Sequence, residues 1–353
     1  MSALETLLLA SPAVVADGSR TRALASGIDP SEYAAVTAGL EATLDWQAAF
    51  RAAAHDHAQL AAQAERDGRL RSAGEAYLDA ARWSHFATTV PHPDRAGHAR
   101  AVAEAADAYR RAMAHLDPGA QRIELPHPAY PLVGILRRPA GAARPPVVLL
   151  VSGLDSSKEE FHYVAEALLA RGVATFAFDG PGQGELSASS TVVADYERVV
   201  SRAVDVLSLR DDVDTARVGM IALSLGGYYG VRAAAFEPRI RALATVTGVC
   251  TLELDAMPEW VAETVAQRAG GMEAAHAFAA QVDAHAFASR VAVPLLVVGA
   301  GADPLVPLDA SQRVAGAAPE GGMLIVADGD HLCANRRWLW LGRSADWLAG
   351  HLR

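Results

Sequence analysis

The sequence predicts an α/β fold: a mostly parallel sheet with helices on its faces, preceded by a helical N-terminal domain. Two observations indicate this. The second part of the chain alternates strand-sized apolar runs with helix-sized segments, which is typical of βαβ units. The first part is rich in alanine and has few clusters of β-branched residues. Because the two compositions meet near Pro118, we expect a helical domain over residues 1–118 and a sheet domain over residues 119–353.

The helical domain is expected to begin a regular helix near Ser31. Leu40, Leu44 and Phe50 follow and supply an apolar stripe. Residues 69–85 carry a second stripe, which resembles one helical hairpin of a repeat protein. No second copy follows at a fixed period, so we interpret the domain as a bundle that packs on the sheet domain.

The sheet domain is expected to contain eight strands. They are Gln121–Leu125, Leu132–Arg137, Val147–Ser152, Val173–Phe178, Val218–Leu223, Ile240–Val246, Leu295–Gly299 and Met323–Ala327. The short link between the first two predicts an antiparallel pair, and the helices between most later ones predict parallel strands. A long interval from about residue 248 to 290 interrupts this order. It has a helical pattern, and we expect it to form a lid over the carboxyl ends of the strands, where open α/β sheets bind ligands.

One apolar run of this domain stops at a serine that small residues surround. Ser224 follows the expected strand Val218–Leu223, with Ala222 two positions before it and Gly226 two positions after. This pattern is typical of a nucleophile elbow, a sharp strand-to-helix turn that lifts one side chain above the sheet, although glycine is usual where Ala222 stands. A serine hydroxyl needs a neighbouring base to become a nucleophile, so the elbow matters only if a base and an acid accompany it.

Candidates for both partners follow downstream. Asp303 comes just after the strand Leu295–Gly299, and His331 comes just after Met323–Ala327. Serine, acid and histidine in this chain order are the pattern of the α/β-hydrolases. Taken singly, such a serine motif is often chance, such an aspartate is usually a turn residue, and such a histidine is usually structural. Together and in order, they predict a catalytic triad of Ser224, Asp303 and His331.

Other acids compete with Asp303 for this role. Asp328 and Asp330 flank the histidine too closely to orient its ring easily. Asp309 is a weaker rival on the same loop region as Asp303. We therefore retain Asp303 as the expected acid.

The oxyanion hole of such a site combines two backbone N–H groups. The first is expected from Leu225, directly after the serine. The second is expected from Leu154 in the loop after the third strand, where Gly153 lets the backbone approach closely.

The rest of that loop invites two local interpretations. Ser157 and Glu160 fit a capping box at the start of the following helix. Lys158 is interpreted either as a substrate contact or as a surface charge. Residues 179–185 form a glycine-rich turn that lacks the Lys-Ser/Thr signature of a phosphate loop, so we interpret it as a rigid turn beside the nucleophile.

Composition limits the partners. The net charge of −10 argues against a nucleic-acid surface, and no apolar run approaches the roughly 20 residues that cross a membrane. Cys250 and Cys333 fit no ligand spacing, so we expect reduced core thiols in a cytoplasmic protein, and no metal or other cofactor. The expected partner is a small-molecule substrate.

Three segments together resemble a known family. Residues 157–160, 179–185 and 224–228 are similar to a branch of the α/β-hydrolases with a helical N-terminal domain, which includes 2,6-dihydroxypseudooxynicotine hydrolase, fungal polyketide-shortening hydrolases and FrsA-type esterases. The resemblance implies the triad and oxyanion assignments above, a serine hydrolase that cleaves a C–C bond next to a ketone, and a homodimer. The lid departs from these relatives, so its candidate substrate contacts rest on position alone: Glu253, Asp255, Glu259 and Trp260.

Three functions therefore stay open. The leading one is C–C bond hydrolysis of a β-diketone or acyl-aromatic substrate of polyketide-like or aromatic type. A carboxylesterase acting on a compact ester would use the same triad. A cyclase or dehydratase on the same fold would retain His331 as a base, because fold alone does not decide the reaction. A binding protein with a vestigial triad is disfavoured by the complete set of three residues.

Overall fold

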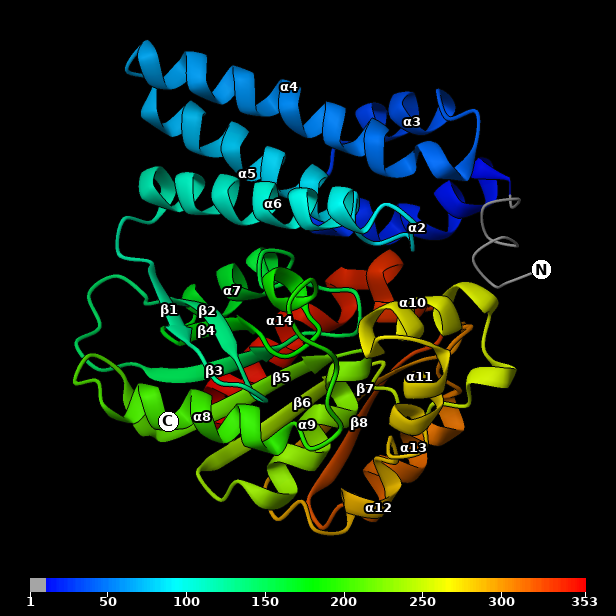
Figure 1. The fold of residues 1–353 in the computed structure, drawn as a ribbon. Coiled ribbons are helices and arrows are strands. Elements are labelled where there is room, and N and C mark those ends of the chain that lie inside the picture. Colours follow the sequence, from blue (N-terminus) through cyan, green and yellow to red (C-terminus); the bar gives the residue numbers. More distant parts are fainter. Residues whose placement is uncertain (1–10) are drawn as a thin grey trace.

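A computed structural model describes residues 11–353, so the first ten residues of the predicted helical domain lie outside the described part. The amino-terminal part forms a helical layer above the sheet, with α5 between α4 and α6 (Figure 1). Its elements are α2 (Pro12–Ser26), α3 (Pro30–Ala38), η1 (Thr43–Asp45), α4 (Trp46–Arg66), α5 (Leu70–Phe86) and α6 (Arg95–Leu116).

Buried aromatic side chains hold the helical layer together. Trp46 stacks on Phe50 with ring centroids 4.1 Å apart, and the Trp46 Nε1 donates a 2.8 Å hydrogen bond to the carbonyl of Phe86. The hydroxyl of Tyr33, which is almost fully buried, donates to the carbonyl of Ala16 at 2.7 Å. These contacts join α2, α3, α4 and α5 into one layer, since buried aromatic groups with a polar atom stabilise a core best when that atom is bonded.

The sheet confirms the predicted fold class. Its eight strands are ordered β1-β2-β4-β3-β5-β6-β7-β8. β2 pairs antiparallel with both β1 and β4, and every other neighbouring pair is parallel. The strands are β1 (Gln121–Leu125), β2 (Leu132–Arg137), β3 (Pro146–Val151), β4 (Ala174–Asp179), β5 (Asp214–Leu223), β6 (Ile240–Val246), β7 (Leu295–Ala300) and β8 (Gly321–Val326).

Helices cover both faces of this sheet, and β3 shows why. Its side chains alternate between faces: Val147 and Leu149 belong to the core under α8 and α9, whereas Val148 and Leu150 belong to the core under α7 and α14. A strand buried on both faces reads as a continuous apolar run. The helices are α7 (His162–Leu169), α8 (Glu197–Ser208), α9 (Leu225–Phe236), α13 (Leu308–Ala317) and α14 (Arg337–His351), with short turns η2 (Gly184–Leu186) and η4 (His331–Arg336).

The interval between β6 and β7 is helical, as the sequence indicated, and we keep the name lid for it, although its covering of the site stays a prediction. It contains η3 (Leu254–Ala256), α10 (Glu259–Ala269), α11 (Met272–Ala279) and α12 (His285–Ala288). In Figure 1 the first of these helices, α10, faces the lower side of the helical layer. Arg95 of α6 donates to the side chain of Gln267 on α10 at 2.8 Å, so the lid is bonded to the helical layer as well as to the sheet domain.

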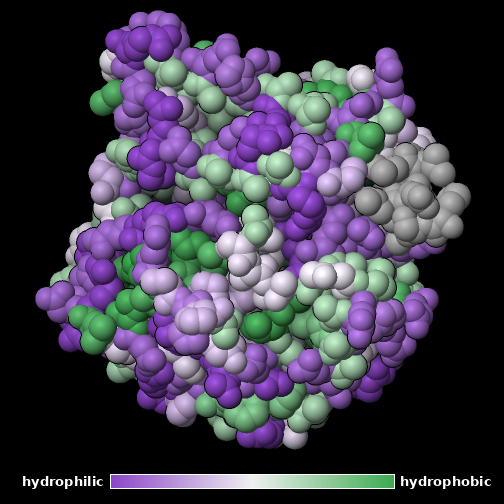
Figure 2. All heavy atoms as spheres, viewed as in Figure 1, coloured by the Kyte–Doolittle hydropathy of each residue, from purple (hydrophilic) through white to green (hydrophobic). Residues whose placement is uncertain are grey.

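The surface mixes polar and apolar residues. Figure 2 shows hydrophilic residues over much of the visible face, with hydrophobic residues in several separate patches. Exposed single apolar residues are ordinary on a protein surface. Within residues 11–353, no helix combines the length and the apolar character that crossing a bilayer would need.

Candidate active site

Ser224 stands at a sharp turn between β5 and α9. Its backbone has φ 55° and ψ −125°, a left-handed conformation that costs free energy for a residue with a side chain. The glycines after it are needed for close packing: a Cβ on Gly226 would lie 2.5 Å from the carbonyl oxygen of Val151, and one on Gly227 would lie 2.2 Å from the Cα of Gly248. The predicted elbow geometry is present, and it holds the serine above the carboxyl end of the sheet.

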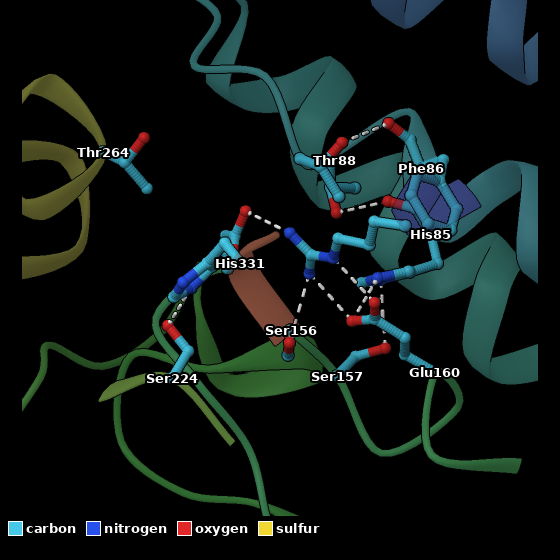
Figure 3. A network of polar contacts seen from close by, with 12 residues as sticks. His85, Phe86, Thr88, Ser156, Ser157, Glu160, Ser224, Thr264 and His331 are labelled. Carbon is cyan, nitrogen blue, oxygen red and sulfur yellow. Dashed lines mark hydrogen bonds and ion pairs between the residues drawn. The ribbon is translucent and has the colours of Figure 1, made fainter. Parts of the chain in front are cut away.

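The structure brings the three predicted residues into one hydrogen-bonded series. His331 Nε2 lies 2.9 Å from the Ser224 hydroxyl, and His331 Nδ1 lies 2.9 Å from Asp303 Oδ2 (Figure 3 shows the first pair). The Asp303 side chain is fully buried, and its other oxygen accepts from the N–H groups of Leu305 at 2.8 Å and Val306 at 3.1 Å. The carboxylate is thereby fixed in the orientation that the imidazole needs to accept a proton from serine.

The loop that carries the histidine is held in an unusual backbone conformation. Leu332 and Cys333, directly after His331, have φ of 68° and 45°. The N–H of Leu332 donates at 3.0 Å to the hydroxyl of Thr247, whose own φ is 44° and whose N–H donates at 2.8 Å to the carbonyl of Val298. Such strain persists only where surrounding contacts enforce it, so these bonds place the imidazole.

Two backbone N–H groups beside the serine are free to bind an oxyanion. Within the described residues, neither the Leu154 N–H nor the Leu225 N–H donates to any acceptor. Leu225 is the first residue of α9, where N–H groups have no partner in the helix and the helix dipole favours negative charge. A Cβ on Gly153 would lie only 3.1 Å from the Ser224 Cβ, so glycine brings the Leu154 backbone close to the serine. Their oxyanion role stays a prediction.

The predicted capping box in the β3–α7 loop is wrong. Glu160 accepts from Arg22 of α2, at 2.7 Å from Nε and 2.8 Å from Nη2, and lies 3.0 Å from the Nε2 of His85 on α5 (Figure 3). The Ser157 hydroxyl lies 3.1 Å from the other ring nitrogen of His85. Helix α7 begins only at His162. The side chains of both residues therefore bond to the helical layer instead of capping α7.

Arg22 also contacts the residues next to the predicted oxyanion donor. Its Nη1 donates to Asp155 at 2.7 Å, and its Nη2 lies 3.1 Å from the Ser156 hydroxyl. Burial alone would raise the pKa of Glu160, but the charges of Arg22 and His85 outweigh it and hold that pKa well below its usual value. The helical layer therefore binds the β3–α7 loop through a stable ion-pair cluster, which no local sequence pattern indicated.

Lys158 is neither a surface charge nor exposed to substrate, because it is buried among three carboxylates. Its ammonium lies 2.8 Å from Asp179, 2.7 Å from Glu159 and 2.5 Å from Glu185. Burial alone would lower the Lys158 pKa, but these carboxylates outweigh it and raise the pKa. The same three carboxylates lie close enough together to hold a cation, and the lysine ammonium forms an ion pair with each of them.

The four lid residues proposed as substrate contacts all lie exposed. Glu253 precedes η3, Asp255 lies within it, Glu259 begins α10, and Trp260 is 39% exposed. Their role remains a prediction from position.

A buried lid residue that the sequence did not single out is Arg268. It is 4% exposed, and its Nη1 donates at 2.9 Å to the Nε2 of His98 on α6. Burial, followed by the charge of Arg268, lowers the pKa of His98 to about 3, so this histidine is neutral and accepts. In the sequence, a single arginine in an amphipathic helix looks the same whether it makes this contact or is exposed to solvent, so the contact could not be predicted.

Comparison with known proteins places these features in a family. The family model "Esterase FrsA-like" matches residues 42–353. The 2,6-dihydropseudooxynicotine hydrolase of Paenarthrobacter nicotinovorans is 31% identical over 319 residues, which cover 86% of this chain and 84% of that protein. A crystal structure of 2,6-dihydroxy-pseudo-oxynicotine hydrolase superposes with a TM-score of 0.84 at 28% identity, covering 94% of this chain and 95% of the other.

A fungal relative matches over a shorter part. The 20-hydroxy-prefusarin hydrolase FUS2 of Gibberella moniliformis is 33% identical over 232 residues, which cover 61% of this chain and 55% of that protein. This chain therefore spans about half the length of that relative. The three proteins are all named as hydrolases.

Proposed function

Because this chain belongs to the FrsA-like esterase family of the α/β-hydrolases, we propose that it is a serine hydrolase whose nucleophile is Ser224. One observation carries the proposal: the serine, His331 and Asp303 form a continuous hydrogen-bonded series next to two backbone N–H groups that donate to no acceptor within residues 11–353. A nucleophile, a base, an orienting acid and oxyanion donors are the parts that acyl transfer needs.

The reaction follows from these positions. The Ser224 oxygen attacks a substrate carbonyl while His331 takes its proton, and buried Asp303 stabilises the imidazolium that results. The N–H groups of Leu154 and Leu225 bind the oxyanion of the tetrahedral intermediate, an effect that contributes about 3 kcal/mol per donor in such enzymes. Collapse of the intermediate breaks the bond to the leaving group, which takes the proton from His331. Water then hydrolyses the acyl-enzyme with the same residues.

We further propose that the bond broken is a C–C bond next to a ketone, in a compact β-diketone or acyl-aromatic substrate. The names of two relatives, 2,6-dihydropseudooxynicotine hydrolase and 20-hydroxy-prefusarin hydrolase, support the substrate class, namely a small molecule of aromatic or polyketide-like type. In C–C cleavage the leaving group is a carbanion, so the substrate itself must delocalise the charge until His331 protonates the carbon. A ketone or phenol next to the bond provides that delocalisation.

Ester hydrolysis is the second candidate, and the family description supports it. An ester needs the same residues, but its leaving alkoxide or phenoxide requires no delocalising group. The two candidates differ only in the leaving group, so substrates that share one acyl group separate them.

The first test is covalent capture of the serine. After treatment with a fluorophosphonate, we expect the intact mass of the wild-type chain to rise by one adduct, and Ser224→Ala to remain unmodified because the attacking oxygen is gone. Ser31→Ala, which removes an exposed serine on α3, is the matched control and should label like the wild type. An adduct that persists in Ser224→Ala, or a folded wild type that does not react, would overturn the proposal.

The same preparation then identifies the bond. Phenyl acetate and 1-phenyl-1,3-butanedione both transfer an acetyl group, but they release phenoxide and a ketone-stabilised carbanion respectively. A kcat/KM higher for the diketone supports C–C hydrolysis. Turnover of the ester alone supports the esterase.

A further inference from the structure

The glycine-rich turn after β4 contains a buried amide that the mechanism above leaves unused. Gln183 is fully buried. Its Nε2 donates to two carbonyls of the β3–α7 loop, those of Ser152 at 2.8 Å and Gly153 at 2.9 Å. Its Oε1 accepts from the N–H of Gly180 at 3.0 Å and from the hydroxyl of Tyr196 at 2.6 Å. A buried amide whose oxygen and NH₂ group are both hydrogen-bonded restricts the orientation of the groups that it bonds.

One of those carbonyls shares a peptide unit with a predicted oxyanion donor. The C=O of Gly153 and the N–H of Leu154 belong to the same planar trans peptide, in which the two groups point in opposite directions. When Gln183 holds the carbonyl, the Leu154 N–H is therefore directed away from Gln183. Glycine resists rotation of the adjoining peptide less than any other residue, so this peptide needs an external contact to keep one orientation.

The direction of the Gln183 amide is itself set by its neighbours. Tyr196 and Gly180 both present donors, so the amide oxygen must face them and the NH₂ must face the loop. Tyr196 is fully buried and stacks on Tyr229 with centroids 4.0 Å apart, which holds its hydroxyl in place. Burial raises the pKa of Tyr196 well above its ordinary value, so the phenol keeps its proton and remains a donor.

We propose that Gln183 is a positioning residue for the oxyanion hole. Through the Gly153 carbonyl it holds the Leu154 N–H toward the oxygen that becomes negative at the serine. The inference rests on the proposed function and deepens it, because it assigns the direction of one donor to a side chain outside the Ser224, His331 and Asp303 series.

This contact differs from the one that Arg22 makes with the same loop. Arg22 bonds the side chains of Asp155, Ser156 and Glu160, and so holds the loop after the donor without touching its peptide. Gln183 bonds backbone carbonyls on the other side of the donor. Losing Arg22 should therefore loosen the loop as a whole, whereas losing the Gln183 amide should turn one peptide.

The test replaces the amide by groups that cannot donate to both carbonyls. Gln183→Glu keeps the shape but offers acceptors to the two carbonyls, and Gln183→Met removes both bonds. For each variant, kcat and KM are measured on a substrate that the wild type turns over, with thermal unfolding as the check of folding. We expect kcat to fall about 100-fold, as on losing one oxyanion donor, with KM changed less than about twofold. Gln59→Glu, the same change on the exposed face of α4, should match the wild type.

A transition-state mimic provides a readout that a merely structural role would not move. A trifluoromethyl ketone forms an oxyanion adduct with an activated serine, and we expect its affinity to fall by the same factor as kcat/KM in the Gln183 variants. Unchanged kcat in folded Gln183→Met, or a loss confined to KM, would overturn the inference.

Tyr196→Phe gives an independent measurement if the Gln183 variants do not fold. It keeps Gln183 but removes one of the two donors that set the direction of the amide. We expect a smaller fall in kcat with unchanged KM, and wild-type kcat in this variant would overturn the inference. Ser224→Ala separates the two proposals: if it retains turnover, the proposed function fails, whereas an inactive Ser224→Ala beside fully active Gln183 variants defeats only the role of Gln183.

Discussion

Two arginines, the half-buried Arg22 and the buried Arg268, join the helical layer to the rest of the molecule, and their surroundings are opposite. Arg22, on α2, is paired with Asp155 and Glu160 of the β3–α7 loop, each at 2.7 Å. Arg268, on the lid helix α10, is 4% exposed, yet no carboxylate among residues 11–353 forms an ion pair with it. Its hydrogen bond goes to the neutral imidazole of His98 on α6.

The difference appears in the pKa of each group. Burial lowers the pKa of both arginines, but the carboxylates around Arg22 outweigh burial and raise its pKa, whereas burial prevails at Arg268 and lowers its pKa to about 10. The contact with the β3–α7 loop is therefore a matched set of charges that is costly to separate. The contact with the lid is a buried charge that no carboxylate among residues 11–353 pairs with directly, although Asp155 and Asp179 favour it from a distance, so removing it should cost little. The helical layer thus holds the loop firmly and the lid weakly.

Removing the paired arginine tests the firm contact and should have the largest effect. Arg22→Met leaves the buried carboxylate of Glu160 and the half-buried one of Asp155 without their cation, and breaking a buried pair costs about 3–5 kcal/mol of the free energy of unfolding. Urea unfolding followed by circular dichroism measures this loss. Arg20→Met, at an exposed position on the same helix, is the control and should stay within about 0.5 kcal/mol of the wild type. A loss below about 1 kcal/mol in Arg22→Met would contradict the inference that the helical layer holds the β3–α7 loop firmly.

Acid should break the contact between Arg268 and His98 before it breaks the contact of Arg22 with the β3–α7 loop. The pKa of His98 is lowered to about 3 by burial and by neighbouring arginines, and burial first, then Arg137 and Arg82, lowers that of His162 to about 3 as well. Both are neutral in the folded chain but bind protons in the unfolded chain below about pH 6.5. The unfolded state therefore holds more protons, and the free energy of unfolding falls as pH decreases from about 6.5 toward 3.

The slope of the free energy of unfolding against pH shows how much His98 contributes to this loss. Between about pH 6.5 and 4.5, before carboxylates take up protons, each such histidine contributes at most about 1.4 kcal/mol per pH unit. We expect His98→Gln to lose less stability over this range than the wild type, by about 1 kcal/mol per unit, while His55→Gln at an exposed position keeps the wild-type slope. Equal slopes in all three proteins would contradict a neutral buried His98. Thermal or urea unfolding at a series of pH values makes the measurement.

Removing the unpaired arginine should have the smallest effect. Arg268→Met eliminates a buried charge that has no ion-pair partner within residues 11–353, so its desolvation cost disappears along with one hydrogen bond to His98. We expect the free energy of unfolding at neutral pH to change by less than about 1 kcal/mol in either direction. A loss as large as that of Arg22→Met would mean that the two contacts are equivalent and that the comparison is mistaken.

The sequence predicted the sheet well because each buried strand is a local signal. Every expected strand is present, and the largest difference in bounds is in β5, which begins at Asp214 instead of Val218. Its first four residues are not fully buried, so the apolar pattern begins only where the strand enters the core. β8 likewise begins two residues early, at Gly321, because glycines carry no apolar signal.

The positions of Ser224, Asp303 and His331 relative to each other could be predicted for a related reason. Each lies at or shortly after the carboxyl end of a parallel strand, and the ends of parallel strands meet at one edge of a sheet. Chain order and strand ends were therefore enough to bring three distant residues together.

The contacts across the helical layer could not be predicted in this way. Arg22 and Glu160 are separated by 138 positions, and neither stands in a pattern that distinguishes a buried ion pair from a solvated charge. The spacing of Ser157 and Glu160 matches a capping box, and only the packing of His85 against both residues shows that their side chains bond elsewhere. Long-range polar pairs of this kind are specified by tertiary packing alone.

Lys158 is the single lysine of the chain, and its ammonium is buried among carboxylates. An amine-acylating reagent therefore finds no lysine to modify while the fold is intact, because acylation requires both access and an unprotonated amine. Modification of this one side chain occurs only when the β3–α7 loop separates from β4. The rate at which Lys158 becomes acylated, read by mass spectrometry, therefore measures how fast the region that carries a predicted oxyanion donor opens.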